Sequence, residues 1–128
     1  MTEQMRVNVS NTDLGKVEIS QDVIEVIASI CASEVAGVFA MQGNFTTGVA
    51  ERLGVKNHRK GVKVEFTDDG IMMDLFVVLK SGVSIPKVAA TLQENIRQTL
   101  KTMTALEISE INVHVVGIEM EDGTISGS

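Results

Sequence analysis

The chain begins its regular pattern with an alternation of apolar and polar residues that changes to helical spacing. Val17 and Ile19 alternate with charged neighbours, which is typical of a half-buried strand. After Ser20, a good N-cap, apolar residues recur at helical spacing as far as Val35 with few polar interruptions. A helix that is apolar around most of its circumference has to be covered on more than one side. The pattern therefore predicts a strand at 16–20, then a helix covered by a sheet and by a second helix or another subunit.

The second half of the chain predicts a β-hairpin, a helix and a last strand. Period-two alternation over residues 61–66 and 71–79 flanks Asp68-Asp69-Gly70, which is strong turn chemistry. Ser84 and Pro86 are typical of a helix start. The apolar stripe of this helix consists of Val88, Leu92, Ile96, Leu100 and Met103. A strand over residues 110–116 completes the order β-α-β-β-α-β.

This order predicts an α+β two-layer sandwich, with two helices packed on one face of a four-stranded antiparallel or mixed sheet. Residues 14–119 are expected to form the single domain. A flexible polar lead is predicted at 1–13 and a flexible acidic tail at 120–128. The stretch from 36 to 60 contains four glycines and predicts a long connection with at most a short helical piece.

Composition limits the chemistry that the chain can perform. Its 128 residues include no Trp, no Tyr and four Phe, so surfaces built on aromatic anchors are disfavoured. The single Cys31 excludes an internal disulfide and a Cys-only metal cluster, and its apolar neighbours favour burial over reactivity. With two histidines and no evident nucleophile, the sequence predicts a protein that is not an enzyme and has no catalytic residues, cofactor or metal.

Charge and hydropathy bear on partners and location. The formal net charge of −6 argues against binding to nucleic acid. No apolar run approaches the roughly 20 residues that span a bilayer, and the first residues are polar, so no direct membrane insertion is expected. We therefore expect a cytoplasmic protein.

One basic segment stands out against the negative total. No acidic residue lies between Arg52 and Val64, and the chain after residue 101 contains no Lys or Arg. The segment is interpreted either as a solvated loop or as a docking surface for an anionic partner. Such a partner would be an acidic protein surface, a phosphorylated or CoA-like metabolite, or the tail of a neighbouring subunit. The candidate docking residues are Arg52, Lys56, His58, Arg59, Lys60 and Lys63.

The strand pattern also predicts a candidate interface on the outer face of the sheet. Alternation places Asp74 and Phe76 on that face of one strand, and Asn112 and His114 on that face of another. His114 near Asp74 and Asn112 could be poised for proton transfer, but a structural or interface histidine is the favoured interpretation.

Several short segments resemble one known family. They are Gly15–Ile19, Val23-Ile24, Ala36–Val38, Gly61–Glu65, Gly82–Ala89, Gln93–Asn95, Met103–Leu106 and Ile111–Gly117. Together they resemble the alkaline shock protein family of Gram-positive bacteria over roughly residues 14–119. Ala105 replaces the glycine usual in that family, which is a mild change provided that the residue does not need a positive φ.

The resemblance implies a functional setting. The segments Gly43–Gly48 and Lys56–Gly61 resemble the cytosolic branch that is commonly encoded beside acetyl-CoA carboxylase subunits. This implies a non-enzymatic interaction or regulatory protein linked to acetyl-CoA carboxylase activity, fatty-acid synthesis and envelope homeostasis. It is expected to be a homo-oligomer, with carboxylase subunits as candidate partners. The alternative is a stress-related structural scaffold that assembles near the membrane through a separate anchor protein.

Overall fold

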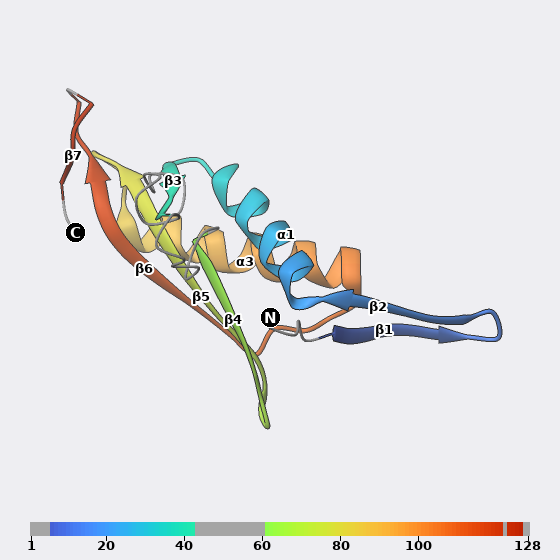
Figure 1. Cartoon of the computed structure of the whole chain (residues 1–128). Helices are drawn as coiled ribbons and strands as arrows, with labels where there is room; N and C mark the ends of the chain where they lie inside the picture. The colour runs from blue at the N-terminus through green and yellow to red at the C-terminus, as the bar shows by residue number, and fades with distance from the viewer. Residues whose placement is uncertain (1–5, 43–60, 122, 127–128) are drawn as a thin grey trace, which may run out of the picture.

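The structure is a sheet covered on one face by two helices, with a two-stranded hairpin that projects from the main body (Figure 1). The computed structural model describes residues 6–42, 61–121 and 123–126. The elements are β1 (Arg6–Thr12), β2 (Gly15–Ser20), α1 (Gln21–Ser33), β3 (Val38–Met41), β4 (Val62–Thr67), β5 (Gly70–Lys80), α3 (Ile85–Thr104), β6 (Glu110–Glu119) and β7 (Ile125–Ser126). The predicted α+β class, with helices packed against a mixed sheet, is confirmed.

Strand β5 is the centre of the sheet. On one side it pairs in parallel with β6, as expected for strands joined by a helical crossover. On its other side it pairs antiparallel with both β3 and β4. Met41 of β3 lies opposite Val77, and Val62 of β4 lies opposite Leu75. β3 and β4 are therefore two consecutive parts of one edge of the sheet, and residues 43–60 connect them.

The core lies between the inner face of the sheet and the two helices. Ser20 caps α1 by accepting a 3.3 Å hydrogen bond from the backbone N–H of Val23, which fixes where the helix begins. Pro86 lies in the first turn of α3, where its missing N–H is harmless. Fully buried residues at this interface are Ile24, Ala28 and Ala32 of α1, Leu92, Ile96 and Leu100 of α3, and Met73, Leu75, Val77 and Leu79 of β5.

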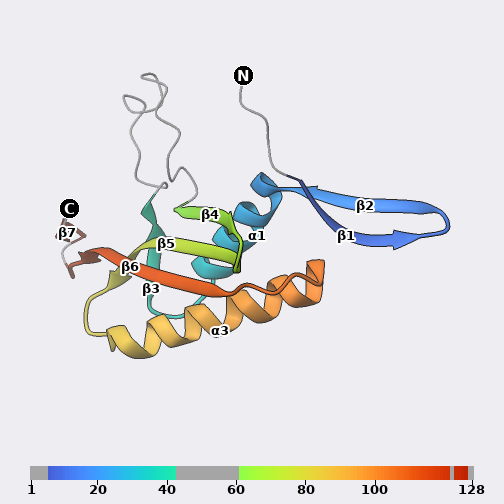
Figure 2. The same ribbon diagram turned by 90° about the horizontal axis from the view of Figure 1, so that it is seen from below.

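The N-terminal part differs from the prediction. Residues 6–12 form β1 instead of a flexible lead, and β2 pairs only with β1 among the described strands. Val7 pairs with Ile19, and both pack partly against the core, while Val17 farther out is 53% exposed. β2 runs directly into α1 at Gln21, and it belongs to the projecting hairpin and not to the sheet of β5 (Figure 2).

Two short strands were not predicted. β3 lies within the expected connection over residues 36–60, and at four residues it is too short to show a clear alternation. β7 lies in the expected flexible tail, where the N–H of Met120 donates a 2.7 Å hydrogen bond to the carbonyl of Thr124. After that turn, β7 pairs antiparallel with β6, opposite Ile118 and Glu119.

The end of α3 also departs from the expected stripe. Met103 is 63% exposed, while Thr104 is buried with its hydroxyl donating a 2.6 Å hydrogen bond to the carbonyl of Leu100. The buried face thus continues in steps of four to Thr104. Ala105 follows as the C-cap with φ 65° and ψ 9°, in the left-handed region that favours glycine. Because Ala105 has a positive φ, alanine in place of glycine is not a mild change at this position.

We predict that Ala105→Gly stabilises the protein by about 1 kcal/mol, because glycine reaches this conformation without the Cβ penalty. Ala90→Gly, in the exposed interior of α3, is the matched control and should destabilise by about 1 kcal/mol. Urea unfolding followed by circular dichroism measures both. Equal signs for the two substitutions would contradict the left-handed cap.

Candidate functional site

The outer face of the sheet brings together the four residues that the sequence predicted there. β5 supplies Asp74 and Phe76, and β6 supplies Asn112 and His114. The parallel register places Asp74 beside Asn112 and Phe76 beside His114, so alternation points all four away from the helices. We call these four residues the outer-face cluster.

Direct contacts hold the cluster together. Asp74 Oδ1 lies 3.3 Å from Asn112 Nδ2 and 2.9 Å from His114 Nε2. Since a carboxylate oxygen only accepts hydrogen bonds, both nitrogens donate to it, which places the proton of neutral His114 on Nε2. The imidazole also stacks on Phe76 with ring centroids 4.8 Å apart and an interplanar angle of 15°. One carboxylate therefore orients two donors, and one aromatic ring fixes the plane of the imidazole.

The cluster is only partly shielded from solvent. The side chain of Asp74 is 20% exposed and that of His114 is 46% exposed. A partly exposed imidazole on a phenyl ring offers an approaching molecule a planar surface and ring-nitrogen hydrogen bonding. This arrangement suits direct binding of another molecule to the outer face of the sheet.

Three further observations concern metal binding, the cysteine and the helices. Among residues 6–42, 61–121 and 123–126, no group of three or more His, Cys, Asp or Glu is placed to hold a metal ion. Cys31 is half-buried on α1, and its Sγ lies 3.5 Å from the Thr99 hydroxyl on α3, far from the cluster in sequence and on the opposite layer. In the same described part of the chain, no helix is long and apolar enough to cross a membrane.

The predicted basic segment can be placed only at its edge. Arg52, Lys56, His58, Arg59 and Lys60 lie outside the described residues. Lys63 is exposed on β4, directly opposite Asp74. Gln42 and Gly61, the described residues on either side of 43–60, are close together, because a Cβ built on Gly61 would lie 3.1 Å from the backbone nitrogen of Gln42. The carbonyl of Gly61 also accepts a 2.8 Å hydrogen bond from the N–H of Phe76, so the residue that precedes β4 adjoins the outer-face cluster.

A second surface lies between the helices and was not predicted as a site. A hollow of about 250 Å³ is lined by Ile27, Ile30, Cys31, Glu34, Thr99 and Met103. Ile30 is 55% exposed there, so the sheet and α3 together do not cover the apolar circumference of α1. The sequence signal was the thin polar stripe of α1, but Met103 was assigned to the core and the hollow could not be located.

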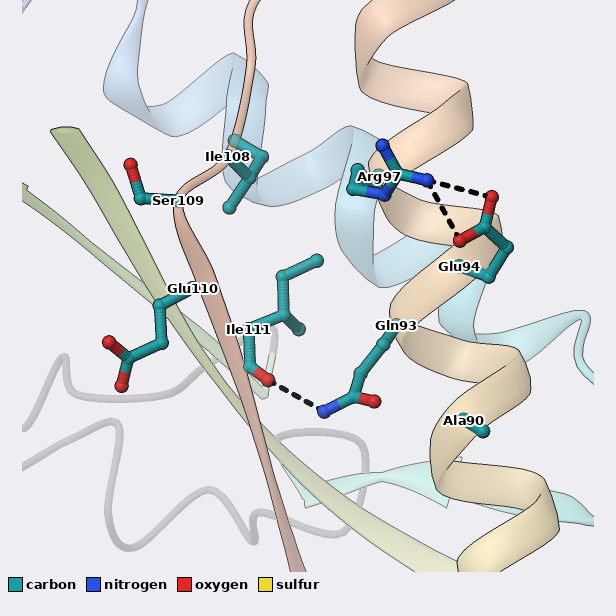
Figure 3. A pocket seen from close by; sticks show the side chains of 8 residues that line it. All are labelled: Ala90, Gln93, Glu94, Arg97, Ile108, Ser109, Glu110 and Ile111. Atoms are coloured by element: carbon teal, nitrogen blue, oxygen red, sulfur yellow. Dashed lines mark hydrogen bonds and ion pairs between the residues drawn. The ribbon is translucent and has the colours of Figure 1, made fainter.

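A third surface lies under the beginning of β6. A hollow of about 200 Å³ is lined by Ala90, Gln93, Glu94 and Arg97 of α3 and by residues 108–111 (Figure 3). Gln93 Nε2 donates a 2.9 Å hydrogen bond to the carbonyl of Ile111, and Arg97 makes two 3.0 Å contacts to the carboxylate of Glu94. These three side chains are engaged within the chain, and the hollow lies between α3 and the beginning of β6.

The family of the chain follows from a comparison of its sequence with family models. Residues 9–120 match the model of the alkaline shock protein 23 family, which is described by the words "cell envelope-related function". The chain belongs to this family. The match covers most of the chain and confirms the resemblance to alkaline shock proteins.

Relatives agree with this assignment. The chain is 61% identical over 117 residues to the Bacillus subtilis protein YqhY, covering 91% of this chain and 87% of that protein. It is 27% identical over 109 residues to a Streptococcus pyogenes protein named stress response regulator gls24 homolog, covering 84% of this chain and 61% of that protein. The family is thus related to the cell envelope and to stress response.

Solved structures show a similar fold at low sequence identity. A MamM CTD structure superposes with a TM-score of 0.51 at 9% identity, covering 73% of this chain and 88% of that chain. A nickel form of a MamM CTD variant gives 0.51 at 9% identity, covering 79% and 99%. At such identity the likeness concerns the fold alone.

We predict a measurable coupling within the outer-face cluster. A double-mutant cycle with Asp74→Ala and His114→Ala should give about 0.5–1 kcal/mol, since the hydrogen bond is short but partly exposed. The control cycle uses Lys101→Ala and Glu107→Ala, an exposed ion pair at 3.4 Å, and should give at most a few tenths of a kcal/mol. Chemical unfolding measures both cycles, and equal couplings would show that the cluster does not orient His114.

Proposed function

We propose that the chain is a non-enzymatic interaction protein that acts in the cytoplasm and regulates acetyl-CoA carboxylase, and through it fatty-acid synthesis and envelope homeostasis. The carboxylase link rests on the resemblance of Gly43–Gly48 and Lys56–Gly61 to a branch commonly encoded beside carboxylase subunits. The observation that carries a contact function is the outer-face cluster, in which one carboxylate and one phenyl ring hold His114 in a fixed orientation.

The geometry of the cluster supports contact with a protein surface. Pre-oriented side chains lose little conformational entropy when a partner binds, which favours recognition at a modest surface. The hollows described above lie on the helical layer and at the sheet edge, whereas the cluster lies on the outer face of β5 and β6. A protein partner therefore suits this face better than an enclosed small molecule.

Charge indicates the character of the partner surface. Lys63 lies beside Asp74, and Gly61, at the end of the basic segment, bonds to Phe76. In our proposal the basic segment and Lys63 face an acidic surface of a carboxylase subunit while the cluster supplies the aromatic and hydrogen-bonding contacts.

The test is co-purification of carboxylase subunits at native expression, with the wild-type chain and with matched charge variants. Lys63→Glu should lower the recovered subunits about fivefold or more, because it places a carboxylate beside Asp74 and against an acidic partner. Reversal of Lys56, Arg59 and Lys60 should do the same. Lys87→Glu, an exposed change on α3, should leave recovery unchanged. Wild-type chain that never enriches the subunits, or equal recovery with Lys63→Glu and Lys87→Glu, would refute the proposal.

A second candidate function is the stress-related scaffold that assembles near the membrane through a separate anchor protein. Its support is the projecting hairpin, whose turn residue Leu14 is fully exposed and whose Val17 is 53% exposed. Exposed apolar residues on a two-stranded ribbon are suited to contact with a neighbour, because such ribbons are only marginally stable alone. The name of the Streptococcus pyogenes relative, stress response regulator, fits either function.

Light scattering at increasing protein concentration separates the two candidates. A regulator should form a small closed oligomer whose mass reaches a plateau, because closed symmetry leaves no free contact surface. A scaffold should grow with concentration, and replacement of Leu14 and Val17 by Ser should stop that growth. Continued growth of the wild-type mass would favour the scaffold over the regulator.

A further inference from the structure

The outer edge of β6 carries an open row of backbone hydrogen-bonding groups. β6 pairs with β5 along residues 110–119, but on its other side it pairs only with β7, at Ile118 and Glu119. No other described strand lies beside residues 110–117. Figure 2 shows this strand on the outside of the sheet, with β5 and β4 following in order.

The pairing pattern identifies which residues face this edge. The N–H of Phe76 bonds to Gly61, so the even-numbered residues of β5 bond toward β4 and the odd-numbered ones toward β6. With Met73 in parallel register with Ile111, Met73 bonds to the residues on either side of Ile111. The backbone groups of Ile111, Val113 and Val115 must then point to the open edge. The hydrogen bond from Gln93 to the carbonyl of Ile111 agrees with this direction (Figure 3).

The edge lacks the usual protection against strand pairing. Natural edge strands are shielded by Lys, Pro, bulges or a covering element. From Glu110 to Gly117 the sequence has no Lys, Arg or Pro, and the bulge lies only at its far end, beyond Val115. Among the described residues, only the Gln93 side chain is bonded to the open side before β7. An open strand of this length is a template for another strand.

We propose that this edge pairs antiparallel with the same edge of a second copy of the chain, about a two-fold axis at Asn112. This inference is independent of the carboxylase proposal. In this register Asn112 lies opposite Asn112 of the second copy, and Glu110 lies opposite His114 of the second copy. Two-fold symmetry creates that Glu–His contact twice, and both side chains are exposed on the outer face.

The same register suits the backbone and the inner face. Ile111 and Val113, which both direct their backbone groups to the edge, become a hydrogen-bonded pair across the two copies. Ile111 can accept this bond while keeping Gln93, because a carbonyl oxygen has two lone pairs. Their apolar side chains meet on the inner face, where Val113 is only partly buried in one copy. The pairing ends before Ile118, so it leaves β7 in place.

The outer-face side chains of β6 are complementary to those of a second, antiparallel β6, which favours a second copy of the chain as the partner. An arbitrary extended peptide would use the backbone groups but has no reason to carry an imidazole opposite Glu110 and a carboxylate opposite His114. The reversed sequence of β6 supplies both at the required spacing.

The first test compares Val113→Pro with Val113→Ala by sedimentation velocity over a wide concentration range. Proline removes an N–H that faces the open edge, so pairing with β5 survives while the dimer is lost. Alanine removes similar side-chain packing but keeps the N–H, and the dimer should persist. A wild-type chain that stays monomeric, or a dimer that survives Val113→Pro, would overturn the proposal.

The second test exchanges the charges and remains informative if proline disturbs folding. His114→Glu should weaken dimerisation about tenfold, because it places two carboxylates opposite each other twice. Glu110→Lys, added to it, makes the opposed charges opposite in sign again. The double variant should regain most of the affinity lost by His114→Glu alone. Residues 110 and 114 of one chain lie too far apart on a strand to compensate each other, so rescue requires contact between copies. Absence of rescue would refute this register.

A disulfide provides a direct readout of the axis. In a Cys31→Ser background, Asn112→Cys places two thiols in a directly opposed pair whose Cα atoms are about 4.5 Å apart, within disulfide range. Oxidation should give a covalent dimer. Glu65→Cys, exposed on the outer face of β4 and away from the edge of β6, is the matched control. This variant should remain monomeric in non-reducing electrophoresis. Equal cross-linking at the two positions would count against the two-fold axis at Asn112.

Discussion

Strand β5 is the constraint on which the rest of the structure depends. It is the only described strand that pairs along both sides over most of its length, with β3 and β4 on one side and β6 on the other. Its inner side chains from Met73 to Leu79 are fully buried under α1 and α3. The same alternation that commits these residues to the core directs Asp74 and Phe76 outward. A one-residue shift of β5 would bury Asp74 and expose the core, so the position of the outer-face cluster is a consequence of core packing.

The same alternation governs the backbone. Because β5 directs its odd-numbered backbone groups to β6, the parallel register leaves Ile111, Val113 and Val115 facing the open edge. The side chains of the next residues, Asn112 and His114, are held by Asp74. The outer face and the edge of β6 are therefore two surfaces of one strand. Pairing through the edge of β6 would join the sheets of two copies into one larger sheet. The outer-face clusters of the two copies would then lie on the same side of that sheet.

The sequence allowed prediction of those features that have a clear period. The buried stripes of both helices, the hairpin of β4 and β5 and the convergence of Asp74, Phe76, Asn112 and His114 all follow from alternation and turn chemistry. The Phe76 and His114 stack and the shared carboxylate follow from a parallel register, which alternation alone does not fix. The expectation that residues 16–20 join the main sheet was wrong for a similar reason. Alternation shows that a strand has an apolar face, but not which strand it pairs with.

Short elements and helix ends depended on tertiary structure. β3 and β7, at four and two residues, exist because the edges of β5 and β6 offer them hydrogen bonds. Met103, expected in the apolar stripe, is exposed and Thr104 is buried, because the buried face of α3 advances in steps of four to its end. Ala105 adopts a positive φ because the chain must leave α3 and turn into β6. None of these features has a periodic signal of its own.

β6 bonds to β5 with alternate residues, and in our proposal the other residues pair with a second chain. Amide hydrogen exchange of the full chain, measured residue by residue at low and high protein concentration, tests it most directly. The amides of Asn112 and His114, which face β5, should be protected at both concentrations. The amides of Ile111 and Val113 should exchange rapidly when dilute and become protected when concentrated. Equal protection of the Val113 amide at both concentrations would show that this edge does not pair with a second chain.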